Sequence, residues 1–190
     1  MAGRRMSYAD RHAQLLDTAA KIVRTEGADA LTLARVAEEA GVSKPVAYEH
    51  FERRASLLAM LYARMDDQQA EAARAALGSR ATTLEEAVRF AAEAYVDCTL
   101  GTGGEFGAVT AALGSIAGAE DRVRDGRERY AGILREALER FMRLPADADA
   151  LMLGVIGAAE ALAREAASER LDRATAVRGI SRIMLGTLHG

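Results

Sequence analysis

Residues 33–58 read LARVAEEAGVSKPVAYEHFERRASLL, and this stretch decides the fold of the N-terminal part of the chain. Thr32 precedes it and can cap a helix, because a threonine hydroxyl accepts a hydrogen bond from a free amide of the first turn. Leu33 and Val36 then recur at helical spacing. Gly41 suits the positive φ at which helices often end, since glycine has no Cβ. The pattern predicts a short helix that ends in a tight turn.

A second short helix is predicted from Lys44 to Phe51. Ser43 stands at its N-cap, and Pro45 lies in its first turn, where the missing N–H breaks no helical bond. Ala47 and Phe51 are four residues apart and share the face that we expect to be buried. Five side chains remain for the exposed arc: Lys44, Val46, Tyr48, Glu49 and His50. Two helices joined by such a turn form a helix-turn-helix, whose second helix enters the major groove of DNA.

These residues resemble the DNA-binding domain of the TetR (tetracycline repressor) family of bacterial transcription regulators. The resemblance covers roughly residues 11–58 and rests on a short signature: Gly27, Leu31-Thr32, Val36-Ala37, Ala40-Gly41-Val42-Ser43, Tyr48, His50, Phe51 and Leu57-Leu58. It implies an all-α fold with an N-terminal three-helix helix-turn-helix DNA-binding domain, residues 1–55. It also implies a C-terminal helical domain for effector binding and dimerisation, residues 56–190.

The resemblance also implies which residues contact a double-stranded DNA operator. The predicted set is Thr32, Arg35, Ser43, Lys44, Pro45, Val46, Tyr48, Glu49, His50 and Arg54. Thr32 and Arg35 are expected to touch the DNA backbone from the first helix of the motif. Tyr48 and His50 are expected to contact phosphates. Arg54 stands where the family usually has a lysine, and it keeps the positive charge for a further phosphate contact.

The remaining residues of the second helix face the groove. Lys44 can also anchor a phosphate, and Pro45 and Val46 approach the bases. Glu49 is unusual on a surface that meets a polyanion. It can accept a hydrogen bond from a cytosine amino group, or it can pair with Arg53 four residues on. For the free protein we expect the pair.

Charge and composition limit the class of protein. The chain has 190 residues and a net charge of −3, which argues against a basic coat for nucleic acid. Ten of the 25 basic residues and 8 of the 28 acidic ones fall within residues 1–64, so this part is +2 and the remainder is −5. The asymmetry has the sign expected for a DNA-reading head on an acidic body.

Other absences narrow the prediction further. The single cysteine, Cys98, excludes an internal disulfide and a cysteine-based zinc site, and we expect no metal and no cofactor. No apolar run approaches the ~20 residues of a membrane span, and no secretory signal opens the chain. A cytoplasmic protein that does not enter a membrane is therefore expected.

Helical periodicity continues along the chain. Longer helices are predicted at 10–25, 56–76, 84–100, 148–167 and 172–188, with Ser56 as the cap of the second. A short helix is predicted around Phe106 to Ile116, and a longer one runs from Val123 to near Pro145. The glycine cluster at 101–104 follows no strand and precedes no lysine, so it predicts a loop. Residues 1–7 are expected to form an arm, in which Arg4 and Arg5 either reach a minor groove or are simply solvated.

The last two predicted helices carry more apolar surface than one partner helix needs, and Gly154 and Gly157 allow close approach of backbones. We expect them to form a homodimer interface, most simply a four-helix bundle across a two-fold axis. The alternative is ordinary packing within one chain. A dimer places two heads over a pseudo-palindromic operator, and the resemblance implies the same.

The resemblance implies a ligand cavity among the middle helices. The candidate lining residues are Leu61, Tyr62, Met65, Val88, Tyr95, Cys98, Phe106, Val109, Thr110, Leu113, Tyr130 and Leu134. Their mixture of aromatic, sulfur and few polar groups fits a small apolar or amphipathic effector. Arg89, Glu93 and Asp97 can orient a polar end of it. The alternative is that these residues form only hydrophobic core.

The sequence shows no catalytic constellation. The three histidines, His12, His50 and His189, are far apart in the sequence and lie on unrelated segments, and no Ser–His–Asp or Cys–His group is suggested. The prediction is a DNA-binding transcription regulator that is not an enzyme, acting as a repressor that its ligand releases from DNA. Two alternatives from other classes are an all-α carrier or enzyme for a small molecule, and a helical adaptor whose head binds protein.

Overall fold

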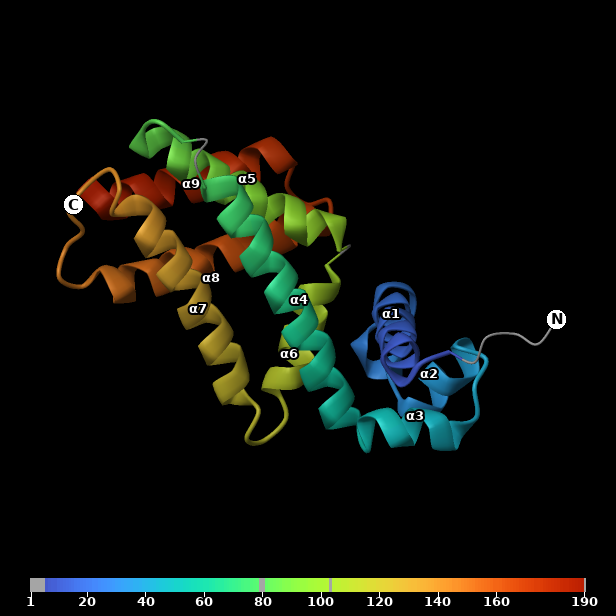
Figure 1. Ribbon diagram of the computed structural model, residues 1–190. Coiled ribbons are helices and arrows are strands. Elements are labelled where there is room, and N and C mark those ends of the chain that lie inside the picture. The colour runs from blue at the N-terminus through green and yellow to red at the C-terminus, as the bar shows by residue number, and fades with distance from the viewer. Residues whose placement is uncertain (1–5, 79–80, 103, 190) are drawn as a thin grey trace.

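The computed structural model describes residues 6–78, 81–102 and 104–189, and Arg4 and Arg5 of the predicted arm lie outside them. Within this part of the chain all regular structure is helical, which confirms the all-α prediction. Three helices form a small head at one end, and a long helix leads from the head into a larger helical body (Figure 1). None of the described helices is long and apolar enough to cross a membrane.

The first helix, α1 (Tyr8–Glu26), begins two residues earlier than predicted because the Ser7 hydroxyl accepts a hydrogen bond from the amide of Asp10. Its buried stripe includes Leu15, Ala19, Ile22 and Val23. It ends at Gly27, whose φ of 87° is accessible to glycine without strain, and a short 3₁₀ turn, η1 (Ala28–Ala30), follows.

The helix-turn-helix forms as predicted. The Thr32 hydroxyl accepts from the amide of Arg35 and starts α2 (Leu33–Glu39). Gly41 has a φ of 66° in the turn, and Val42 packs against the core of the head. The second helix, α3 (Lys44–Phe51), has Ser43 at its N-cap, but the serine side chain makes no capping hydrogen bond.

The long helix α4 (Arg54–Leu77) begins before the predicted cap Ser56, because Arg53 is already in the extended conformation of an N-cap residue. Its inward face buries Leu57, Leu58, Leu61, Tyr62 and Met65. These side chains belong to the same hydrophobic cluster as the head, and the cluster continues to Val109 and Leu113. The proposed division at residues 55 and 56 therefore cuts through shared core, and it stays a prediction.

Five further helices build the body: α5 (Leu84–Gly101), α6 (Glu105–Gly114), α7 (Glu120–Leu138), α8 (Ala148–Ala167) and α9 (Arg173–His189). Two predicted helices extend too far at their C-terminal ends. The short helix was predicted to reach Ile116, but α6 ends at Gly114. The longer one was predicted to end near Pro145, but α7 ends at Leu138. A second hydrophobic cluster joins the far half of α4 to α5, α7, α8 and α9. Helix α6 packs mainly on α4 and also touches α1, so it lies between head and body.

Candidate functional site

The outer surface of α3 presents the residues that the sequence assigned to DNA. Lys44, Pro45, Tyr48 and Glu49 are exposed, and Val46 is half-buried. Half of the Tyr48 side-chain surface is accessible, which is unusual for an aromatic residue and leaves its hydroxyl free to donate. The arrangement suits a helix that lies in a groove and reaches the phosphates beside it.

His50 was expected on this exposed arc, and that expectation is wrong. Only 6% of the residue is exposed, because the imidazole stacks on the Tyr8 ring with 4.1 Å between centroids and lies 5.5 Å from the ring of His12. Burial lowers the pKa of His50, and the nearby His12 lowers it further. The Nδ1 atoms of both histidines are buried, and among residues 6–78, 81–102 and 104–189 neither has a hydrogen-bond partner.

The supposed separation of His12 and His50 is also wrong. Helix α1 brings Tyr8 and His12 against the end of α3, where Phe51 completes an aromatic cluster. The position of His12, three residues before the buried Leu15, is the sequence signal that could have placed it on the inner face of α1.

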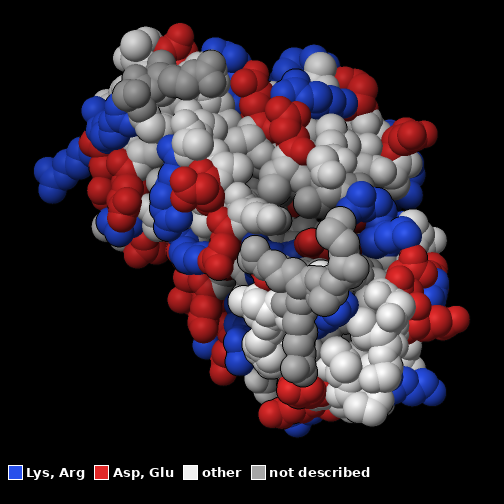
Figure 2. Space-filling view, turned by 45° about the vertical axis from the view of Figure 1, so that its right-hand side comes forward, with Lys and Arg blue, Asp and Glu red and all other residues white. Residues whose placement is uncertain are grey.

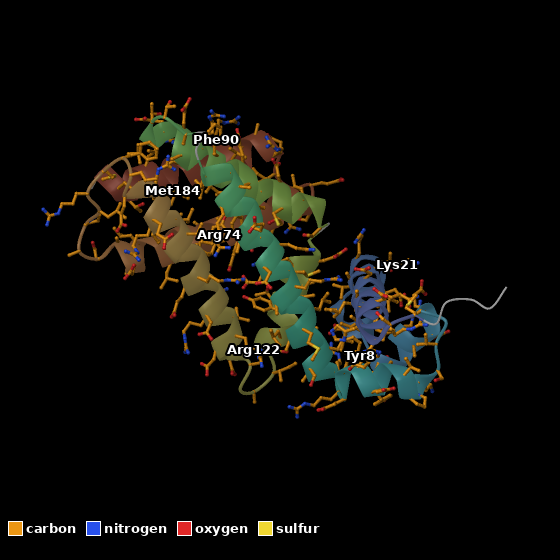
Figure 3. The ribbon with its side chains drawn as sticks, viewed as in Figure 1. Tyr8, Lys21, Arg74, Phe90, Arg122 and Met184 are labelled. Carbon is orange, nitrogen blue, oxygen red and sulfur yellow. The ribbon has the colours of Figure 1, made fainter. Side chains whose placement is uncertain are left out.

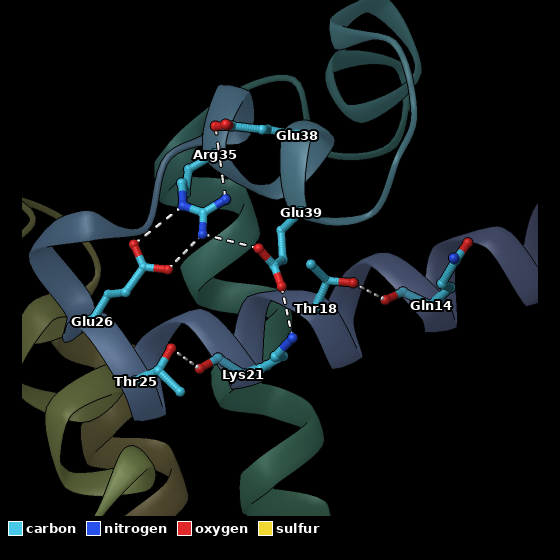
Figure 4. Close-up of polar contacts among 8 residues, drawn as sticks. All are labelled: Gln14, Thr18, Lys21, Thr25, Glu26, Arg35, Glu38 and Glu39. Carbon is cyan, nitrogen blue, oxygen red and sulfur yellow. Dashed lines mark hydrogen bonds and ion pairs between the residues drawn. The ribbon is translucent and has the colours of Figure 1, made fainter.

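Arg35 is committed to an ion-pair network within the head (Figure 4). Its guanidinium lies 2.7 Å from a carboxylate oxygen of Glu26 and 2.9 Å from one of Glu39, and Lys21 binds the other Glu39 oxygen at 2.7 Å. Lys21 and Arg35 lower the pKa of the Glu39 carboxyl. In the free protein this network ties α2 to α1, so a backbone contact by Arg35 requires exchange of a carboxylate for a phosphate.

Arg54 is likewise engaged inside the protein. Its Nε and Nη2 atoms donate to the carbonyls of Leu31 and Ala28, each at 2.8 Å. The side chain therefore fastens the start of α4 to η1, and the expected phosphate contact is not prepared in this conformation. Arg53 is exposed, and among the described residues no ion pair joins it to Glu49, contrary to expectation.

On the face shown in Figure 2, positive charge is not gathered into one continuous surface. Figure 2 shows lysine and arginine interspersed with acidic residues across the face in view. The head is thus distinguished by the residues that α3 exposes, and not by a continuous basic patch on the face in view.

A cavity of about 400 Å³ lies in the body between α5, α6, α7 and α8. Its lining residues are Tyr95, Thr99, Gly104, Phe106, Gly107, Thr110, Ala111, Gly114, Glu120, Val123, Arg127, Glu160 and Arg164. Three predicted residues are among them: Tyr95, Phe106 and Thr110. Tyr62 and Tyr130 line a smaller adjoining hollow, and Leu134 reaches a third hollow behind Tyr130.

The other predicted lining residues do not face this cavity. Leu61, Met65, Val88, Val109 and Leu113 are buried core, because at helical spacing they point toward neighbouring helices. Cys98 is half-buried and lines none of these three hollows, and burial raises the pKa of its thiol.

The polar residues of the cavity differ from those that were expected. Arg89 pairs with Glu93 at 3.2 Å and Asp97 pairs with Arg173 at 2.5 Å, so all three predicted polar residues are engaged elsewhere.

Inside the cavity, Arg127 donates two hydrogen bonds of 2.8 Å to Glu160, and this pair raises the pKa of the guanidinium. The two residues are 33 positions apart, so no sequence spacing could have revealed the pair.

The inner wall of the cavity is connected to the head. Phe106 stacks on Tyr62 of α4 with 5.5 Å between ring centroids. Its neighbour Glu105 is 3% exposed and forms an ion pair with Arg24 of α1. One short helix thus carries a pocket-lining ring and, beside it, a charge bound to the head.

Fold and site together define an all-α helix-turn-helix protein with a hollow helical body. Residues 15–61 match the family model described as bacterial regulatory proteins, tetR family. The HTH-type transcriptional activator FasR of Mycolicibacterium smegmatis is 34% identical over 95 residues, which cover 50% of this chain. The chain spans 43% of the length of that relative. Residues 15–61 thus resemble the DNA-binding domain of the TetR family, and the match to FasR extends the likeness over half of the chain.

Solved structures of similar fold extend over the whole chain. A TetR-like transcriptional regulator from Rhodococcus sp. RHA1 gives a TM-score of 0.73 at 22% identity, covering 98% of this chain and 100% of the other. The transcriptional regulator FadR from Bacillus subtilis, solved in complex with stearoyl-CoA, gives 0.78 at 15% identity, covering 94% and 100%. These likenesses confirm the arrangement of head and body.

Proposed function

We propose that this protein is a DNA-binding transcription regulator whose α3 reads an operator. The observation that carries the proposal is the exposed row Lys44, Tyr48 and Glu49 on the second helix of a helix-turn-helix of the TetR family. Lysine and tyrosine bind phosphate oxygens and orient the helix, while Val46 and Glu49 approach base edges. His50 supports this surface from beneath, through its stack on Tyr8.

The protein acts as a homodimer through α8 and α9. On the outer face of α8 the exposed Leu153, Gly154 and Gly157 follow one another at helical spacing, and on α9 Ile183 is 40% exposed next to Gly186 in the following turn. An apolar face with small residues permits close packing of the same two helices from a second copy. Two heads then meet two half-sites of a pseudo-palindromic operator.

A small amphipathic effector binds the body cavity and releases the protein from DNA, so the protein works as a repressor. Ligand binding shifts the equilibrium only if the two states bind the ligand differently. The contact of Phe106 with Tyr62 and the ion pair of Glu105 with Arg24 supply that difference, because both link a cavity wall to the head. The stearoyl-CoA complex of a structural neighbour supports an acyl compound as one class of effector.

The decisive experiment is DNA binding by fluorescence anisotropy, with DNA that flanks the protein's own gene and a scrambled duplex, at several salt concentrations. Tight, salt-sensitive and sequence-selective binding is the expected result. Binding equal to the scrambled control for all flanking DNA would contradict the proposal. Binding to protein without steep salt dependence would favour the adaptor, and ligand-dependent turnover would favour the enzyme.

The direction of regulation has a separate test, because the relative FasR is named an activator. A reporter behind the bound promoter is expected to rise when the gene for this protein is deleted. A fall in reporter activity would show activation instead, while leaving the assignment of DNA binding intact.

A further inference from the structure

We infer that the body cavity takes an elongated amphipathic molecule with an uncharged oxygen, a hydroxyl or carbonyl, at its buried end. Gln69 and Tyr130 select for that oxygen. The inference rests on the proposed function, since the same cavity is taken to hold the effector. It adds the chemical class of ligand and the residues that determine specificity.

Two buried polar atoms at the inner end of the site have no hydrogen-bond partner within the described part of the chain. They are Nε2 of Gln69 and the hydroxyl of Tyr130, and these two residues are only 5% and 6% exposed. A buried donor without a partner costs about 1–3 kcal/mol, so proteins rarely retain one without a reason. A ligand oxygen that accepts from both groups removes this cost.

These two groups are adjacent to the large cavity. Both line the small hollow of about 10 Å³, whose wall shares Tyr95, Phe106 and Thr110 with the 400 Å³ cavity. The Tyr95 ring stands nearly perpendicular to the Tyr130 ring, with 5.4 Å between centroids. The hollow is thus the inner continuation of the cavity, and it has room for about one oxygen atom or one water.

The charges around the hollow favour an uncharged oxygen. Asp66 and Glu160 line it as well, and each already has an arginine partner, Arg129 and Arg127. Arg127 lines the hollow too, so the charges there are already paired and no free counter-ion remains for a charged ligand group of either sign. A hydroxyl or carbonyl oxygen can accept a hydrogen bond there without bringing an unpaired charge into the hollow.

The rest of the cavity lining determines which groups the ligand can carry along its length and at its outer end. Phe106 and Val123 supply apolar wall, and the exposed glycines of α6 leave the mouth wide. Arg164 is exposed at this mouth and makes no ion pair among the described residues, so it can hold an anionic group in contact with water. An ω-oxygenated organic acid combines both features.

The test compares two acids that differ by one oxygen, decanoate and 10-hydroxydecanoate, binding to the full chain in a calorimeter. We expect the hydroxy acid to bind at least about fivefold more tightly, since one satisfied buried hydrogen bond is worth about 1 kcal/mol or more. Tyr130→Phe and Gln69→Leu should each remove most of this preference. Tyr8→Phe, which deletes a hydroxyl on the head, should leave it unchanged.

Stability gives a readout without any ligand. Tyr130→Phe should match or exceed the melting temperature of the wild type, because it deletes a hydroxyl that lacks a partner. A clear loss of stability would show that the hydroxyl is hydrogen-bonded within the fold and would overturn the inference. Equal affinity for the two acids, a preference that survives in both variants, or no binding of either acid would also overturn it.

The outcome is separable from that of the proposed function. Operator binding by the ligand-free protein tests the head alone. Operator binding with no preference for 10-hydroxydecanoate would remove the inference about the ligand and leave the regulator standing.

Discussion

Arg24 of α1 forms an ion pair with Glu105 of α6, and the carboxylate is almost fully buried whereas the guanidinium is half-exposed. The pair crosses from the head to the helix that lines the cavity. The hydrogen bond to Glu105 raises the pKa of the arginine. A buried carboxylate without its partner is costly, so the pair makes the position of α6 depend on that of α1.

The first prediction concerns this pair. Arg24→Gln should lower the free energy of unfolding by about 1–3 kcal/mol, because Glu105 is left buried without its cation. Glu105→Gln in the same chain should restore most of the loss and weaken the release of DNA by ligand. Urea denaturation measures the first effect and anisotropy the second. If the effects of the two substitutions were simply additive, the pair would not couple α1 to α6.

The second prediction compares the two lysines of the chain, Lys21 and Lys44. Lys44→Ala should weaken operator binding and reduce the slope of log affinity against log salt concentration by about 1, because one phosphate contact is lost. Lys21→Ala removes the same charge but breaks only the contact with Glu39. Figure 3 labels Lys21 on α1, and its variant should retain the wild-type slope. If both variants lowered the slope equally, the effect would come from the loss of one positive charge anywhere on the protein, and not from a phosphate contact of Lys44.

The third prediction concerns pH. Burial lowers the pKa of His50, and the positive charges of His12 and Arg11 lower it further while Glu49 acts in the opposite sense. The folded protein therefore binds fewer protons than the unfolded chain near the ordinary histidine pKa of ~6.5. The contribution of His50 to the free energy of unfolding should be fully present above that pH. It should decrease as the pH falls through that value toward the lower pKa of the folded protein.

Thermal unfolding between pH 7.5 and pH 5 measures this effect. Tyr8 stacks on His50, and Figure 3 labels it next to the end of α3. A His50→Gln variant should lose part of the pH dependence. A variant with the full wild-type dependence would assign the effect to other groups.

The fourth prediction concerns Gly126 of α7. A Cβ at this position would overlap the Tyr62 hydroxyl and press on the Asp66 carboxylate at 3.1 Å. Gly126→Ala should therefore destabilise the protein by about 1–3 kcal/mol, although alanine favours helix. Gly132→Ala in the same helix meets no atom within 4 Å and should stabilise it by up to about 1 kcal/mol. Tyr62→Phe should relieve most of the overlap, and a failure of that rescue would locate the strain elsewhere.

The fifth prediction tests the dimer. Leu153 and Ile183 are about two-fifths exposed on α8 and α9. Leu153→Glu combined with Ile183→Glu should convert dimers into folded monomers, because four carboxylates would face one another across the interface. Sedimentation velocity gives the mass and circular dichroism the helix content. Dimers that persist would place the interface on another face.

Much of the head was predictable because its determinants are local. The cap at Thr32, the turn at Gly41 and the buried pair Ala47 and Phe51 depend on residues within a few positions of one another. Helix boundaries were less accurate where a side chain took an unexpected role, as with Ser7, which starts α1 early.

The cavity was predicted only in part. Apolar residues at helical spacing lie on the same face whether that face meets a neighbouring helix or a hollow, so Val88 and Leu113 could not be told from Tyr95 and Phe106. The polar groups were missed for another reason. Arg127 and Glu160 carry no local signal, since each reads as an ordinary exposed charge until α7 and α8 are packed together.

The sequence by itself determined the all-α class, the helix-turn-helix and the exposure of Lys44, Tyr48 and Glu49 on α3, because these follow from helical period, capping and glycine conformation. Only the tertiary structure decided the fate of side chains with long reach. It buried His50 under Tyr8, turned Arg54 onto the carbonyls of Ala28 and Leu31, and left Gln69 and Tyr130 unpartnered behind the cavity. Each of these depends on a group distant in the chain, and sequence periodicity holds no information about which distant groups packing brings into contact.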